Sequence, residues 1–191
     1  MTILRLKTAI FGKSLLILFM ILFSIVLLSN SAQAGSAAVI DVKVNEALDK
    51  FHKEVKSAKE LVIKSHGILV FPSVIKAGIG IGGEYGEGAL RINGKTVDYY
   101  NTASVSIGLQ LGAQAKTVIL LFMTNEALSN FRNSEGWEVG VDGSVALVKV
   151  GAGGSLDTLN IKEPILGFVI GQKGLMYNLT LEGSKITKIK K

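Results

Sequence analysis

Glycines in the segment 78–88, GIGIGGEYGEG, have the spacing of a dinucleotide-binding loop. Gly78, Gly80 and Gly83 match G-x-G-x-x-G, and Asp98 lies about 20 residues further on, where an acid would bind a ribose hydroxyl. In such a site the glycine loop opens a helix whose N-terminus faces the pyrophosphate. Two further glycines and an Asn-Gly pair interrupt the segment that follows, so no helix fits there. The pattern therefore does not predict a nucleotide site.

Other side chains that could perform chemistry are few. His52 and His66, the two histidines, have no further His or Cys at metal-ligand spacing, which argues against a zinc site. Glu84 and Glu87 could form an acid–base pair, but their glycine-rich surroundings favour solvated turn residues. The chain has no Cys and no G-x-S-x-G nucleophile elbow. We therefore expect a protein without enzymatic activity, cofactor or bound metal.

Residues 1–34 are typical of a secretory signal peptide. Three basic residues and no acid accompany an apolar run at 14–28, and Ala32-Gln33-Ala34 has the small residues of a cleavage site. The run is short for a membrane span, which needs about 20 residues. We expect cleavage between Ala34 and Gly35, rather than an uncleaved anchor, and a periplasmic or envelope location.

Residues 35–191 carry only a mild positive charge. The first 34 residues hold three of the 21 basic residues and none of the 15 acids, so 18 bases against 15 acids leave a net charge of +3. This charge permits attraction to an anionic membrane surface and does not require a nucleic-acid partner. The length suits one domain that buries its core without disulfides.

Residues 41–64 are predicted to form one amphipathic helix, with Asp41 as N-cap and Gly67 as stop signal. Its apolar residues recur at gaps of three and four, which places them on one stripe. They are Val44, Leu48, Phe51, Val55, Ala58 and Val62. The stripe packs on the rest of the domain in one interpretation. In the other, the helix lies on a membrane or a partner with its lysines near lipid headgroups, although interspersed acids weaken this alternative.

The chain from 67 to 191 is predicted to be rich in β-structure. Segment 104–114 alternates, with Val105 on one face and Ser104 on the other, which indicates a half-buried strand. The seven apolar residues 117–123 suit a central strand covered on both faces. A short helix is expected near 124–132, with Thr124 as N-cap. Further strand-like segments are 137–150, 165–172, 175–181 and 185–190.

The glycine row of 78–82 alternates with Ile79 and Ile81, so it is better explained as a strand that lacks side chains on one face. A row of glycines in a strand indicates close backbone approach, bending or a bulge. We therefore predict an α+β fold, with a strongly curved, mainly antiparallel sheet that is sandwich- or barrel-like. The layer that approaches the glycines could be the first helix or a lipid chain.

From about His66 onward the chain resembles the lipid-binding SYLF domain, also called the Ysc84 family. The similar stretches are residues 67–90, 99–131, 136–147 and 172–187. The resemblance implies a non-enzymatic domain that binds anionic lipids; eukaryotic members bind phosphoinositides, and some bind actin filaments. For a secreted chain, phosphatidylglycerol or cardiolipin is the more sensible target. Protein partners are left open, and no nucleotide or nucleic acid is expected.

The C-terminal tail SKITKIKK supplies candidate lipid-binding residues from its own composition. Lys185, Lys188, Lys190 and Lys191 occur in it without an acid. Each lysine near an anionic membrane is worth on the order of 1 kcal/mol. The alternative is a solvated chain end. Two other functions remain open, a periplasmic carrier of an apolar ligand and an envelope protein that acts through protein–protein contacts.

Overall fold

The computed structural model describes residues 36–148, 163–173, 181 and 183–191. All of them lie in the second of the two units into which the chain divides, Gly35–Lys191. The expected signal peptide and its cleavage site at Ala34 and Gly35 lie outside the described residues, as does most of the strand expected at 175–181. None of the described helices has the length and hydrophobicity to cross a membrane.

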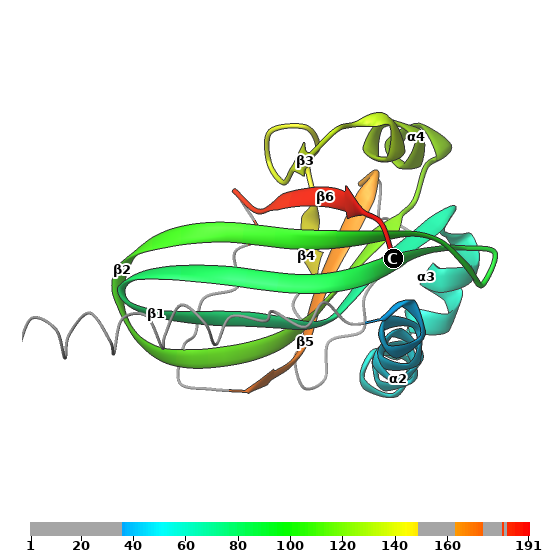
Figure 1. The fold of residues 1–191 in the computed structure, drawn as a ribbon. Helices are drawn as coiled ribbons and strands as arrows, with labels where there is room; N and C mark the ends of the chain where they lie inside the picture. The colour runs from blue at the N-terminus through cyan, green and yellow to red at the C-terminus, as the bar shows by residue number, and fades with distance from the viewer. Residues whose placement is uncertain (1–35, 149–162, 174–180, 182) are drawn as a thin grey trace, which may run out of the picture. The chain divides into compact units, whose positions relative to one another are not determined.

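Two helices stand where one was expected (Figure 1). α2 spans Ala37–Glu54 and α3 spans Ala58–Lys64. Val55 adopts an extended conformation and interrupts the helical path. Ser36, not Asp41, is the N-cap of α2, since its hydroxyl accepts a hydrogen bond from the Val39 amide at 3.3 Å. The Asp41 carboxylate instead accepts hydrogen bonds from Thr96 and Tyr99, which joins α2 to the strand that follows the hairpin turn.

One long hairpin organises the sheet. β1 spans Gly67–Ile92, and β2 spans Lys95–Phe122. They pair antiparallel over nearly their whole length. The turn consists of Asn93 and Gly94, both with positive φ, as the Asn-Gly pair predicts.

Shorter elements complete the fold and confirm its α+β class. α4 spans Asn125–Asn133, close to the predicted range, and Thr124 caps it. The remaining strands are β3 (Trp137–Glu138), β4 (Ala146–Val148), β5 (Ile165–Lys173) and β6 (Lys185–Ile189). Apart from β1, which pairs with β2, the sheet order is β3-β6-β2-β5-β4. Only β4 and β5 pair in parallel among the described strands, so the predicted mainly antiparallel sheet is confirmed.

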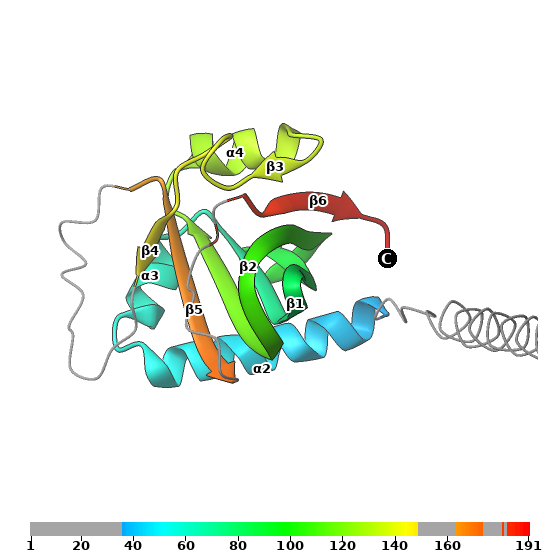
Figure 2. The same ribbon diagram turned by 90° about the vertical axis from the view of Figure 1, so that its left-hand side faces the viewer.

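The sheet carries a hydrophobic core on each face. On one face, the buried α2 residues Ile40, Val44 and Phe51 pack against Val70, Ile119 and Phe168. Phe51 meets Phe168 edge to face at 4.8 Å between ring centroids. On the other face, the α4 residues Leu128 and Phe131 pack with Leu120 and Phe122 of β2. The run 117–123 is therefore a central strand covered on both faces, and Figure 2 shows α2 and α4 on opposite sides of the sheet.

The layer that approaches the glycines is β1 itself. The hairpin bends near residues 79–81, where its register shifts, and the second half of β1 returns against the first half. A Cβ on Gly86 would lie 2.9 Å from the Ser73 carbonyl oxygen, and one on Gly88 would lie 2.7 Å from the Phe71 ring. The glycines are needed because backbone packs directly on backbone. The first helix is not the approaching layer.

Candidate functional site

The bend of the hairpin is the most unusual surface of the described structure. We define the bend as residues 73–86 of β1 together with residues 102–116 of β2. Its pairs run from Val74 opposite Lys116 to Gly86 opposite Thr102. Figure 1 shows this bend at the left, at the end of the hairpin away from α2 and α3.

The interior of the bend contains three charged side chains. Lys116 Nζ lies 2.8 Å from Glu84 Oε2, and Lys76 Nζ lies 3.5 Å from Glu84 Oε1. The side chain of Lys116 is 2% exposed, that of Lys76 is 7% exposed and that of Glu84 is 9% exposed. A buried ion pair is destabilised by desolvation unless its charges stay paired. These residues therefore form a buried Lys–Glu–Lys cluster with one excess positive charge.

Gln114 extends the polar interior. It stands opposite Lys76 in the register of β1 and β2, and only 4% of it is exposed. Its Nε2 has no hydrogen-bond partner among the described residues. A cavity of about 10 Å³, bordered by Glu84, Thr102 and Lys116, leaves room for about one water molecule. The cavity is also lined by apolar residues, among them Phe71, Val118 and Leu120, and its small volume disfavours it as a binding site for an apolar ligand.

The outer face of the bend is apolar and open to solvent. Val105 is 79% exposed, Ile81 is 66% exposed and Ile75 is 56% exposed. The alternation around Val105 was therefore correct, but the usual burial is inverted, because polar side chains such as Thr102 and Gln114 are the buried ones. Alternation defines two faces of a strand, and it does not determine which of them meets water.

No charged residue contributes to this outer face. Within 73–86 and 102–116 the charged residues are Lys76, Glu84 and Lys116. All three belong to the buried cluster. The bend therefore presents uncharged residues outward and keeps its charges inside.

Glu84 and Glu87 are not solvated turn residues, contrary to expectation. Both lie within β1, since the hairpin turn comes later at Asn93 and Gly94. Glu87 accepts a hydrogen bond from the Tyr85 hydroxyl at 2.9 Å and pairs with Lys191. The roles of Lys76 and Lys116 were missed, because nothing in the sequence of a single strand indicates that a lysine points inward.

The four tail lysines divide into two groups. Lys188 pairs with Asp98, and Lys191 pairs with Glu87 at 2.9 Å, its side chain 7% exposed. Lys185 and Lys190 are exposed and form no ion pair with any described residue. Lys185 and Lys190 are thus the tail lysines better placed to meet an anionic surface, and the lipid role of all four stays a prediction.

The comparisons with known proteins place part of this architecture in a family. Residues 103–191 match the model of Ysc84, which is described as Las17-binding protein actin regulator. Residues 103–191 belong to the Ysc84 family. The Ysc84 match starts inside β2, so it includes Val105 and Lys116 of the bend and all elements from α4 to β6. No curated protein matched the chain.

The Ysc84 segment contains no group of three or more His, Cys, Asp or Glu residues that could hold a metal, as far as the structure describes it. The same holds for the rest of the described chain. His66 is exposed after α3, and His52 is half-buried in α2 with no hydrogen-bond partner for Nε2 among the described residues.

Tyr100 yields a pH prediction for the strand next to the tail. Burial and, to a smaller extent, the nearby Asp98 carboxylate together raise the pKa of Tyr100 to about 12, against a lowering effect of Arg132. Because the folded pKa lies above the ordinary 10.0, neutral Tyr100 favours folding below about pH 10, and this contribution is lost as the pH rises towards 12. Titration of phenolate absorbance should show a last step near pH 12 that the Tyr100→Phe variant lacks. Titration of all tyrosines in one step near 10 would contradict this prediction.

Proposed function

We propose that this chain is a non-enzymatic lipid-binding protein that docks on anionic phospholipid membranes through the outer face of the bend. The observation that carries the proposal is the exposed, uncharged outer face around Ile75, Ile81 and Val105, with the three charged residues of the bend enclosed. The membership of residues 103–191 in the Ysc84 family supports it, since the SYLF domain that the chain resembles is lipid-binding.

Apolar surface is destabilised by contact with water, and charged side chains are destabilised by contact with lipid. Removal of each Å² of apolar surface from water lowers the free energy by roughly 25 cal/mol. A charged side chain in the hydrocarbon region of a membrane would cost about 2.5–3.5 kcal/mol on insertion scales. For a face with exposed Val and Ile and no charge, contact with lipid therefore lowers the free energy by burying apolar surface and adds no cost of burying a charge. A protein that bound its partner through charge alone would not need apolar residues outside and charged residues inside the bend.

Anionic lipid is the proposed target because of charge. Residues 35–191 carry a net charge of +3, and Lys185 and Lys190 are exposed in the tail. Lysines near an anionic surface contribute on the order of 1 kcal/mol each. In this proposal the lysines provide attraction that salt weakens, and the bend provides apolar contact that salt does not weaken.

α2 is not the proposed membrane contact. Its apolar stripe, including Val44 and Phe51, is buried against the sheet, and Arg91 of β1 donates a hydrogen bond to its Asn45 at 2.6 Å. Exposing this stripe to a membrane would require the helix to leave the core. An envelope or periplasmic location belongs to the proposal through the signal peptide expected at residues 1–34.

Liposome co-sedimentation of residues 35–191 tests the proposal. The Val105→Glu variant should bind vesicles of phosphatidylglycerol and phosphatidylcholine at least about tenfold more weakly, the equivalent of ~1.4 kcal/mol. Ile63→Glu is the matched control, since Ile63 is 83% exposed on α3 and takes the same change of charge. Binding of the unchanged chain should rise with the fraction of anionic lipid and fall with salt.

The outcomes separate the remaining functions. Binding that survives Val105→Glu but drops when the four tail lysines become Gln would move the contact to the tail. Binding lost only in Ile63→Glu would move it to the helices. No binding to any vesicle would refute lipid docking, and a defined oligomer under those conditions would favour an envelope protein that acts through protein–protein contacts.

A further inference from the structure

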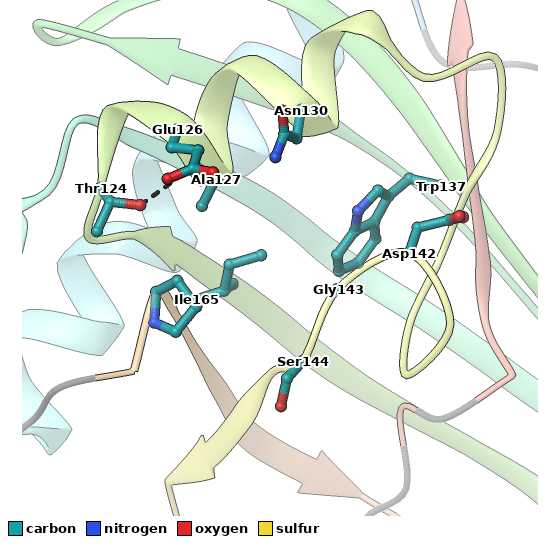
Figure 3. Close-up of a pocket in the computed structure, with 10 residues that line it drawn as sticks. Thr124, Glu126, Ala127, Asn130, Trp137, Asp142, Gly143, Ser144 and Ile165 are labelled. Carbon is teal, nitrogen blue, oxygen red and sulfur yellow. Dashed lines mark hydrogen bonds between the residues drawn. The ribbon is translucent and has the colours of Figure 1, made fainter.

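A second candidate site lies away from the bend, between α4, the loop after β3 and the start of β5 (Figure 3). It is an open cavity of about 250 Å³. The residues that line it are Thr124, Glu126, Ala127, Asn130, Trp137, Asp142, Gly143, Ser144, Pro164 and Ile165. A cavity of this size is smaller than a typical drug-sized site and suits a ligand of a few heavy atoms.

Trp137 supplies a fixed hydrogen-bond donor to this cavity. The residue is 2% exposed, and its indole packs edge to face on Phe131 at 5.6 Å between ring centroids. Gly143 lies so close that a Cβ there would be 2.6 Å from Cζ2 of the ring. Figure 3 shows the ring nitrogen on the cavity side. This Nε1–H donates a hydrogen bond to no described residue. Because an indole nitrogen can only donate, the group on a ligand that would pair with it must be a hydrogen-bond acceptor.

The charge of the residues that line the cavity indicates which charge a ligand would carry. Two carboxylates, Glu126 and Asp142, border the cavity, and no Lys, Arg or His is among the lining residues. One oxygen of Asp142 already accepts the Glu138 amide at 2.7 Å. Glu126 forms no ion pair with a described residue, and it lies in the first turn of α4, where the helix dipole stabilises a carboxylate. A cation is the complementary ligand.

We propose that this cavity binds a small organic ammonium compound that also carries a hydrogen-bond acceptor, as an alkanolamine does. The ammonium group meets Glu126, and the acceptor receives the indole N–H of Trp137. Asn130 and Ser144 offer further neutral polar groups at the rim. Such a group occurs free in solution and in the headgroup of an amine-bearing phospholipid. The site is separate from the outer face of the bend, so it stands independently of the proposed membrane docking.

The chain reports on this site by itself, because Trp137 is its only tryptophan. Titration of residues 35–191 with ethanolamine should change the tryptophan fluorescence in a saturable way. Ethylene glycol, which replaces the ammonium with a hydroxyl, should have no comparable effect. The Glu126→Gln variant should bind ethanolamine about tenfold more weakly, whereas Glu135→Gln should bind it unchanged. Glu135 is exposed, lies outside the lining and loses the same charge in its variant.

Three outcomes of the ethanolamine titration would contradict binding in the cavity beside Trp137. An equal response to ethylene glycol, an unchanged affinity in Glu126→Gln, or no saturable response would each overturn the proposal. Glycerophosphoethanolamine, the soluble headgroup of the lipid, distinguishes the two sources. Tighter binding of it than of ethanolamine would assign the site to a lipid headgroup, and weaker binding would assign it to a free amine. Because no vesicle is present, these results do not depend on membrane docking.

Discussion

Replacing Glu84 with Gln is expected to lower the free energy of unfolding by about 3–5 kcal/mol, the usual cost of breaking a buried ion pair from one side. Glu84 is the only carboxylate that contacts Lys76 and Lys116 in the described structure. Without its charge, two lysine side chains that are 7% and 2% exposed would face each other with no counter-charge. Urea unfolding followed by circular dichroism would measure the loss.

Two further variants control this experiment. Glu54→Gln removes one charge from the exposed pair with Lys50, whose atoms are 3.7 Å apart, and should change stability by less than about 1 kcal/mol. A triple variant, Lys76→Met, Glu84→Leu and Lys116→Met, should recover much of the lost stability, since apolar replacement of a whole buried cluster is often neutral. If Glu84→Gln were as harmless as Glu54→Gln, the cluster would not be enclosed as described.

Replacing Gly88 with Ala is expected to destabilise the fold by about 3 kcal/mol or more, at the upper end of the cost of overpacking. The added Cβ would overlap the carbonyl oxygen of Val70 and lie 2.7 Å from the Phe71 ring. The overlapping partner is backbone, which cannot rotate away as a side chain could. The two halves of β1 would have to separate, and the interior of the bend would open.

Gly83→Ala is the matched control for this prediction. Gly83 belongs to the same strand, but a Cβ there would only reach the Ser104 carbonyl oxygen at 3.6 Å, an ordinary contact. The free energy of unfolding of the Gly83→Ala variant should stay within about 0.5 kcal/mol of that of the unchanged chain. Equal effects of the two substitutions would show that glycine flexibility, and not close packing, determines the behaviour of β1.

Much of the local structure could be predicted from the sequence. The positions of the first helical segment, of α4, of the Asn93-Gly94 turn and of the buried strand 117–123 follow from periodicity and turn chemistry, which depend on neighbours along the chain. The interruption at Val55 was missed, because its apolar stripe continues unbroken through it. Asp41 was misassigned as a cap, because its partners Thr96 and Tyr99 come from β2.

The candidate site required the tertiary structure. The amino-acid sequence alone predicted that a row of glycines lacks side chains on one face, and that Val105 and its apolar neighbours in sequence alternate with small and polar residues. It also determined the resemblance to the Ysc84 family. Only the folding of β1 back on itself decided that the glycines meet backbone and that Lys76 and Lys116 share Glu84. The reason is that strand periodicity specifies two faces, whereas which face meets water depends on what packs against it from elsewhere in the chain.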